Sequence, residues 1–322
     1  MPARNRMPRP LRALLIFNPA SGQAGSSPQQ LADILSAIQD RNILSEVYMV
    51  HRNGDVERTV RRAVKDGVKL VVVAGGDGTI DRVAGALVGS SATLAIIPTG
   101  TRNNVAFNLG IPGTPAEAVS LLRGGRGLKI DVGSVTIGRS RRWFLEAASL
   151  CLISDMYPAA DELQHGNLEQ IGTLFSAFVA STPASLRAVL GDRQRLDASA
   201  YMVLITNMPY LGPRLQFAPH ISCRDGRLDM FIFSDMSKLD LISFAVRSAA
   251  GPVIDAHVRH LRLTKVRIGS TPPMPVLADG VPLGLGPVTV QVHPRSLSVL
   301  VGATGPAIEP VAASKRRELD AG

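Results

Sequence analysis

The sequence has 322 residues, 45% of them hydrophobic and 19% charged, which is typical of a folded globular protein of about two domains. A net charge of +9 favours anionic partners, but with 4% aromatic residues and no aromatic-basic interleaving we expect no nucleic acid. No stretch approaches the roughly 18 apolar residues of a membrane span, and no signal-peptide core is found, so we expect a cytoplasmic protein with peripheral membrane association.

The first part of the chain alternates between two hydrophobic periods. Strands are predicted at residues 14–17, 47–50, 70–74 and 94–97, and helices at residues 31–38, 56–64, 80–88 and 114–124. This repeated strand-helix order predicts a parallel sheet covered by helices, a Rossmann-like α/β domain over residues 13–133. Residues 1–12 and 306–322 have no apolar period and are predicted to be flexible tails.

After residue 133 the pattern changes to short strands of period two. They are predicted at residues 203–205, 228–233, 261–268, 288–292 and 297–301. A helical insert is predicted at residues 168–179, where apolar side chains recur at helical spacing. These patterns predict a β-sandwich domain over residues 134–301, with the return of its last strand to the first domain left open.

A glycine-rich turn joins the third predicted strand to the helix that follows. It reads Gly75-Gly76-Asp77-Gly78-Thr79. Glycines at a helix N-terminus let backbone N–H groups approach a phosphate, and the carboxylate of Asp77 would repel that phosphate unless a divalent cation or an ordered water mediates. The turn therefore predicts a metal-phosphate site; the alternative is a turn that only satisfies backbone geometry. A polar loop, residues 98–104, ends the next strand at the same edge of the sheet.

Four motifs together resemble the diacylglycerol kinase catalytic-domain family, bacterial-type lipid kinases related to sphingosine and ceramide kinases. The motifs are Asn-Pro-Ala-Ser-Gly at residues 18–22, the glycine turn at 75–79, Pro-Thr-Gly-Thr-Arg-Asn-Asn at 98–104 and Asp-Gly-Arg-Leu-Asp at 225–229. The glycine turn alone is shared with NAD kinases and phosphofructokinases. The resemblance implies an ATP- and Mg²⁺-dependent enzyme with a nucleotide-binding domain and a β-sandwich lipid-substrate domain. It would transfer the γ-phosphoryl group to a hydroxyl of diacylglycerol or a related lipid.

The resemblance also implies roles for individual residues. The nucleotide-binding positions would be Asn18, Ser21, Gly22, Gly75, Gly76, Asp77, Gly78, Thr79, Ile80, Asp81, Thr101 and Asn103. Asp77 would hold the catalytic magnesium, with Asp131 as a second acidic position. Asp225 would hold a structural magnesium together with the main-chain carbonyls of Ser222 and Arg227. The alternative at Asp225 is an Asp-Gly turn without a metal.

The sequence departs from the family pattern at three places. Asn104 stands where aspartate is usual, and Asp81-Arg82 where an Asn-Glu pair is usual. Val281 follows Asp279-Gly280 at the position of the family's presumed glutamate base, and valine cannot accept a proton. The candidates that remain are Glu146 and Asp279, with Asp77 as the third catalytic residue.

Three functions are therefore open. The leading one is an ATP-dependent lipid kinase. The alternatives are a weakly active or non-catalytic nucleotide- or lipid-binding relative, and an NAD kinase-like enzyme. The acceptor lipid and the oligomeric state leave no sequence signature.

Overall fold

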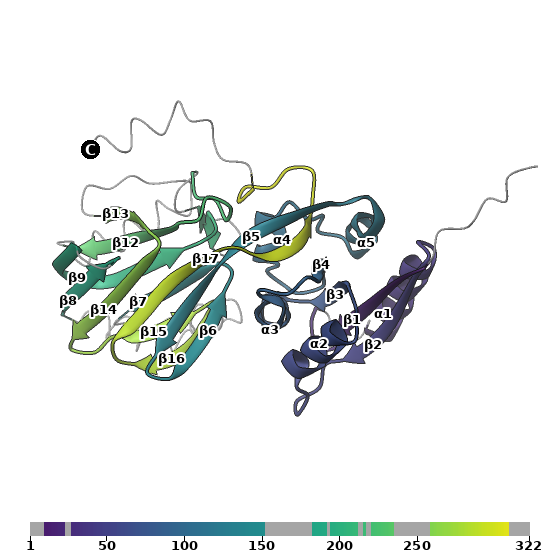
Figure 1. Cartoon of the computed structure of the whole chain (residues 1–322), viewed down its shortest axis with the longest axis horizontal. Coiled ribbons are helices and arrows are strands. Elements are labelled where there is room, and N and C mark those ends of the chain that lie inside the picture. The colour runs from purple at the N-terminus through teal and green to yellow at the C-terminus, as the bar shows by residue number, and fades with distance from the viewer. Residues whose placement is uncertain are drawn as a thin grey trace, which may run out of the picture. The chain divides into compact units, whose positions relative to one another are not determined.

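The computed structural model describes residues 10–22, 27–151, 182–191, 194–211, 215–216, 220–234 and 258–308. The predicted helical insert at residues 168–179 lies outside these described residues. The chain divides into two compact units (Figure 1). The first contains Met1–Lys129 and Leu297–Gly305, and the second contains Ile130–Ser296 and Pro306–Gly322.

A parallel sheet forms the centre of the first unit. Its strands are β1 Leu11–Phe17, β2 Ile43–Met49, β3 Leu70–Gly75 and β4 Thr93–Pro98, in the spatial order β2-β1-β3-β4. The end of β17, Val288–Val301, continues this sheet beside β4, where Ser298 is in register with Thr93. Every residue of β3 is buried, which explains its continuous apolar run. The four predicted strands and the α/β class are confirmed.

Helices connect these strands, and the four predicted helices are confirmed. They are α1 Ser27–Gln39, α2 Val56–Lys65, α3 Asp77–Leu87 and α5 Pro115–Gly124. The side chain of Asp55 caps α2, while Thr114 and Glu117 form the capping box that begins α5. α2 packs on α3, and α1 packs on α5. One further helix, α4 Asn104–Asn108, was not predicted, because five residues are too few to show a period.

The second unit is a β-sandwich in which the paired strands with described registers run antiparallel. Its longer strands are β5 Arg126–Ile137, β6 Ser140–Phe144, β7 Ala147–Cys151, β8 Ala184–Leu190, β9 Gln194–Thr206, β12 Leu228–Ser234, β13 Val258–Leu263, β14 Lys265–Thr271, β15 Pro275–Ala278 and β16 Val281–Leu285. The short strands β10 Tyr210–Leu211 and β11 Leu215–Gln216 form a separate pair. Buried aliphatic side chains from most of the longer strands form one hydrophobic core, so the predicted β-sandwich is confirmed.

Three of the strand predictions after residue 133 were wrong in their limits. The single strand predicted at residues 261–268 is divided between β13 and β14, because β13 pairs with β12 whereas β14 pairs with β8 and β17. The separate strands predicted at residues 288–292 and 297–301 are one strand, β17. The polar residues His293 to Ser296 interrupt its apolar pattern, and Arg295 has a φ of 49°, but the strand continues through them.

Candidate functional site

The strand order of the first unit indicates where a ligand would bind. The chain passes from β1 outward to β2, returns to β3, and then continues outward on the other side to β4. β1 and β3 are therefore the neighbours at which the direction of winding reverses. Open α/β sheets bind ligands beyond the carboxyl ends of the strands at such a switch point. The loops that leave β1 and β3 are residues 18–22 and the glycine turn.

Hydrogen bonds join these two loops to each other and to the loop after β4. Asn18 Nδ2 donates to Thr79 Oγ1 over 2.9 Å, and the hydroxyls of Ser21 and Thr99 lie 2.7 Å apart. The Thr99 amide also donates to the carbonyl oxygen of Gly75 over 3.2 Å. Three motifs that are far apart in sequence thus form one connected surface at the sheet edge.

Glycine is required where the loops approach most closely. A Cβ atom on Gly100 would lie 2.5 Å from the Cα atom of Gly76, so neither loop could keep its position with a side chain there. Gly22 has a φ of +80°, and its Cβ would lie 2.5 Å from the carbonyl oxygen of Thr99. A Cβ on Gly78, in contrast, would have no neighbour within 4 Å, so the first turn of α3 borders open space.

This first turn of α3 has the properties of a phosphate site. Gly76 is the N-cap residue, and its carbonyl oxygen accepts hydrogen bonds from the amides of Thr79 and Ile80. The amides of Asp77 and Gly78 precede these bonds, so helix geometry leaves them without an intrahelical acceptor. Two N–H groups at the positive end of a helix dipole attract an anion. The side chains of Ile80 and Asp81 are buried, so these two predicted nucleotide-binding residues would contribute through their backbone atoms.

Asp77 supports the loop after β4 as well as lying in the glycine turn. Its two carboxylate oxygens accept hydrogen bonds from the amides of Asn104 and Val105, each over 3.2 Å, at the first turn of α4. Asn103 bonds both the amide and the carbonyl of Gly100, and Thr101 is exposed. A carboxylate has about four lone-pair positions, so Asp77 keeps acceptor capacity. A half-buried oxygen donor beside a phosphate site fits Mg²⁺.

Asp131, the second predicted acidic position, lies on β5 and is fully buried. One of its oxygens accepts from the amide of Gly226 and the other from the amide of Arg295, each over 2.7 Å. Burial raises the pKa of this carboxyl above its usual range, and the two amide donors act in the opposite direction. These contacts all lie in the second unit. A magnesium role for Asp131 stays a prediction.

Asp225 lies in the turn before β12 and forms an ion pair with Arg262 of β13. Its other oxygen accepts from the amide of Arg227 over 3.0 Å, and Gly226 has a φ of +72°. Burial raises the pKa of Asp225, while the charge of Arg262 lowers it. A guanidinium already bonds the carboxylate that a structural magnesium would need. This ion pair favours the turn without a metal, and a magnesium role for Asp225 with the main-chain carbonyls of Ser222 and Arg227 stays a prediction.

The three positions considered for the base lie together. Asp279 and Gly280, with φ values of 44° and 75°, form the two-residue turn between β15 and β16, and Val281 follows at the start of β16. The carboxylate of Asp279 accepts hydrogen bonds from the amides of Leu145, Glu146 and Ala147 over 2.6, 3.0 and 2.9 Å. Asp279 therefore fixes the backbone at Glu146, whose side chain is buried.

Two further contacts, one in each unit, could not be predicted from the sequence. Arg82 of α3, which departs from the family pattern, makes a two-point ion pair with Glu57 of α2 over 2.8 and 2.9 Å. Asn207 is buried and donates from Nδ2 to the carbonyls of Asp131 and Leu145, and from its amide to the carbonyl of Glu146. Asn207 lies in no recognisable motif, and nothing in the sequence indicates that Arg82 pairs with Glu57.

Comparisons with known proteins agree with this arrangement. Residues 12–135 match the family described as diacylglycerol kinase catalytic domain, and residues 159–301 match the one described as YegS C-terminal NAD kinase beta sandwich-like domain. The chain is 25% identical over 276 residues to a diacylglycerol kinase of Bacillus subtilis, covering 84% of this chain and 89% of that protein. It is 29% identical over 226 residues to a probable lipid kinase YegS-like protein of Klebsiella pneumoniae, covering 69% and 74%.

Solved structures share the fold. A diacylglycerol kinase structure from Bacillus anthracis superposes with a TM-score of 0.72 at 22% identity, covering 91% of this chain and 98% of that one. An NAD kinase from Archaeoglobus fulgidus is more distant, with a TM-score of 0.51 at 13% identity, covering 91% and 94%. The glycine turn, the strand order and the two matched domains agree, and the chain belongs to the diacylglycerol kinase catalytic-domain family of lipid kinases.

Proposed function

We propose that this lipid kinase transfers the γ-phosphoryl group of ATP to a hydroxyl of diacylglycerol or a related lipid. The observation that carries the proposal is the glycine turn at the switch point, where two helix N-terminal amides and the carboxylate of Asp77 lie side by side. Phosphoryl transfer depends on positioning and on charge neutralisation more than on covalent chemistry. The backbone donors would position the phosphates, and Mg²⁺ held by the adjacent carboxylate would neutralise their charge.

Each loop has a part in holding the nucleotide. The amides of Asp77 and Gly78 bind phosphate oxygens, and Asn18, Ser21 and Thr101 border the nucleotide. Mg²⁺ held at Asp77 would neutralise the charge of the β- and γ-phosphates. The hydrogen bond between Asn18 and Thr79 keeps the first loop against the glycine turn before ATP binds, so little ordering is needed on binding.

Glu146 is our candidate for the base. In the transfer, the lipid oxygen forms a bond to the γ-phosphorus, the bond to the ADP oxygen breaks, and the hydroxyl proton passes to the Glu146 carboxylate. The three amide bonds of Asp279 occupy most of its acceptor capacity, which makes it a positioning residue for Glu146. Val281 has no acceptor.

A nucleotide and acceptor assay tests the activity. ADP release is measured with ATP and Mg²⁺ against diacylglycerol, sphingosine and NAD in parallel. We expect turnover with diacylglycerol and a fall of at least about 100-fold in Asp77→Asn, because a neutral amide holds Mg²⁺ more weakly than a carboxylate does. Asp40→Asn, an exposed carboxylate in the same unit, is the matched control and should keep full activity. Full activity in Asp77→Asn refutes the metal role, and turnover with NAD alone refutes the lipid kinase.

Three variants locate the base, each assayed for kcat and for thermal stability. Glu146→Gln should lower kcat by about 10²–10⁴-fold with little change in melting temperature, because glutamine keeps the size and shape of the side chain but cannot take up the proton. Asp279→Asn should lower both, since an asparagine oxygen cannot accept from three amides. Val281→Glu should leave kcat unchanged or lower it, because a second carboxylate near Glu146 disfavours the charged form of both. A rise in kcat in Val281→Glu, with no loss in Glu146→Gln, would show that position 281 is where a base is needed.

The second candidate is a relative that binds nucleotide or lipid and turns over slowly. Val281 in the family's base position favours it. In that case ATP binds, as measured by calorimetry, and Asp77→Asn weakens the binding, but none of the three acceptors accelerates ADP release.

A further inference from the structure

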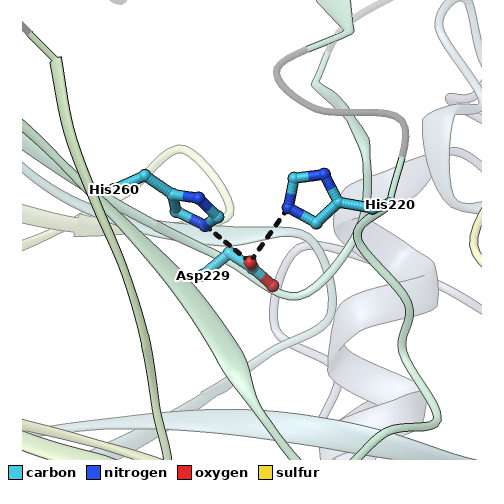
Figure 2. A group of neighbouring side chains, drawn as sticks. All are labelled: His220, Asp229 and His260. Atoms are coloured by element: carbon cyan, nitrogen blue, oxygen red, sulfur yellow. Dashed lines mark hydrogen bonds and ion pairs between the residues drawn. The ribbon is translucent and has the colours of Figure 1, made fainter. Parts of the chain in front are cut away.

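A group of side chains of the kinds that bind metals lies in the second unit, outside the residues assigned above. Figure 2 shows His220, from the loop before β12, with Asp229 of β12 and His260 of β13. One potential ligand atom from each residue lies within 4.8 Å of the other two. The proposed kinase chemistry uses none of them.

Their geometry is close to that of a metal site. Both imidazole rings direct Nε2 toward the same oxygen, Oδ1 of Asp229, from 2.7 Å for His260 and 3.8 Å for His220 (Figure 2). Ligand atoms at about 2.0–2.2 Å from a tetrahedral Zn²⁺ lie about 3.4 Å apart. The two observed distances lie on either side of this value, and the ligand atoms of the two histidines lie within 4.8 Å of each other, so small side-chain movements would admit the ion.

The charges around Asp229 favour a cation. Asp229 is 1% exposed, and its Oδ2 has no hydrogen-bond partner within the described part of the chain. The nearby guanidinium of Arg262 pairs with Asp225, and its Nε lies 3.6 Å from Asp229 Oδ1. Asp225 and Asp229 thus share the positive charge of one arginine, which leaves one negative charge that Arg262 does not neutralise. A buried charge without a counter-charge destabilises the folded state.

We propose that His220, Asp229 and His260 bind a divalent transition-metal ion of the Zn²⁺ class. Two imidazole nitrogens and one carboxylate oxygen suit Zn²⁺, and water would complete the coordination. Phe231 stacks on the His260 ring, with centroids 4.6 Å apart and planes 6° apart, and so holds this ligand in orientation. The ion joins the loop at His220 to the paired strands β12 and β13 and thereby stabilises the second unit.

Metal titration of the full-length, tag-free chain tests the proposal after removal of metals with a chelator. Zn²⁺ should bind with a stoichiometry of one per chain and raise the melting temperature, and Co²⁺ should give the visible absorption of a low-coordinate site. His220→Gln and His260→Gln should each weaken binding by at least about 10-fold. His51→Gln, an exposed histidine of the first unit, is the matched control and should bind as the unaltered chain does.

Two results would overturn the proposal. One is the absence of stoichiometric Zn²⁺ binding by the unaltered chain, in which case the cluster is only a hydrogen-bonded pair of histidines around a carboxylate. The other is wild-type affinity in both histidine variants. The Co²⁺ spectrum of the unaltered chain decides the question even if a variant fails to fold. Binding is measured without ATP or lipid, so the outcome is independent of the kinase assay.

Discussion

His293 shows how a single half-buried side chain makes stability depend on pH. It lies on β17, with Nε2 2.9 Å from the Ser134 hydroxyl and its ring edge-on to Trp143. Burial, and to a smaller degree the charge of Arg141, lowers the pKa of His293 below the ordinary value of 6.5. The folded chain therefore keeps this histidine neutral at a pH where the unfolded chain binds a proton.

We predict that His293 lowers the free energy of unfolding as the pH falls. The stability that the neutral histidine contributes is present above about pH 6.5 and is lost between this pH and the lowered pKa of the folded state, because the unfolded state takes up the proton first. Melting temperatures of the wild type and His293→Gln, measured from about pH 7.5 to about pH 5.5, should show a steeper decline in the wild type. His51→Gln should follow the wild-type curve. Parallel curves for wild type and His293→Gln would contradict this prediction.

At the scale of elements, the ion pair between α2 and α3 explains one departure from the family pattern. Arg82 places two guanidinium nitrogens on the two oxygens of Glu57, and both side chains are about two-thirds buried, with 34% and 30% exposed. This hydrogen bond lowers the pKa of Glu57. Arg82 thus holds α3 against α2 through an ion pair, and α3 is the helix that carries the glycine turn.

A double-mutant cycle measures this connection. Arg82→Ala, Glu57→Ala and the double variant should give a coupling free energy of about 0.5–1 kcal/mol in urea unfolding, reduced by salt because the pair is partly exposed. The exposed pair of Arg62 and Asp66 within α2, 3.8 Å apart, is the internal comparison, and we expect its coupling to be near zero. Equal couplings for the two pairs would show that the two-point geometry adds nothing.

At the scale of the whole molecule, the net charge of +9 concerns how the enzyme meets a lipid substrate. No helix within the described ranges is long and apolar enough to cross a bilayer. From the sequence we expect a membrane-facing basic surface to include Arg259, Arg262, Lys265 and Arg267. Of these, Arg259 and Arg267 are exposed, Lys265 is half-buried, and Arg262 is paired with Asp225. Peripheral association stays a prediction, and Arg262 is the least suited of the four to support it.

We predict salt-sensitive binding to anionic vesicles. Phosphatidylglycerol vesicles should sediment the chain at low salt and release it at about 0.5 M salt, because exposed charges are screened within about 10 Å already at 0.1 M. Phosphatidylcholine vesicles are the control. The double variant Arg259→Glu, Arg267→Glu should weaken binding to the vesicles. A chain that ends at Ile308 shows how much of the binding comes from the basic C-terminal tail. If the chain fails to sediment with anionic vesicles at low salt, electrostatic binding to the membrane is ruled out.

Local patterns in the sequence determined the α/β unit, the glycine turn and the family. A strand or helix of the first unit shows its period within about ten residues, and a phosphate-binding turn needs only a strand, a few glycines and a helix. The same reasoning fails for α4, which is too short, and for β13 and β14, whose division is decided by their different partner strands.

Only the tertiary structure decided which distant side chains meet. Asp279 bonds the Glu146 amide across 133 positions, Arg262 reaches Asp225 across 37, and Arg82 reaches Glu57 across 25. Sequence reasoning proposed Glu146 and Asp279 as alternatives for one role, whereas their contacts support a base and the residue that positions it. The histidine cluster left no motif either. Strand pairing places these residues together, and pairing depends on the packing of the entire sheet, which no short segment encodes.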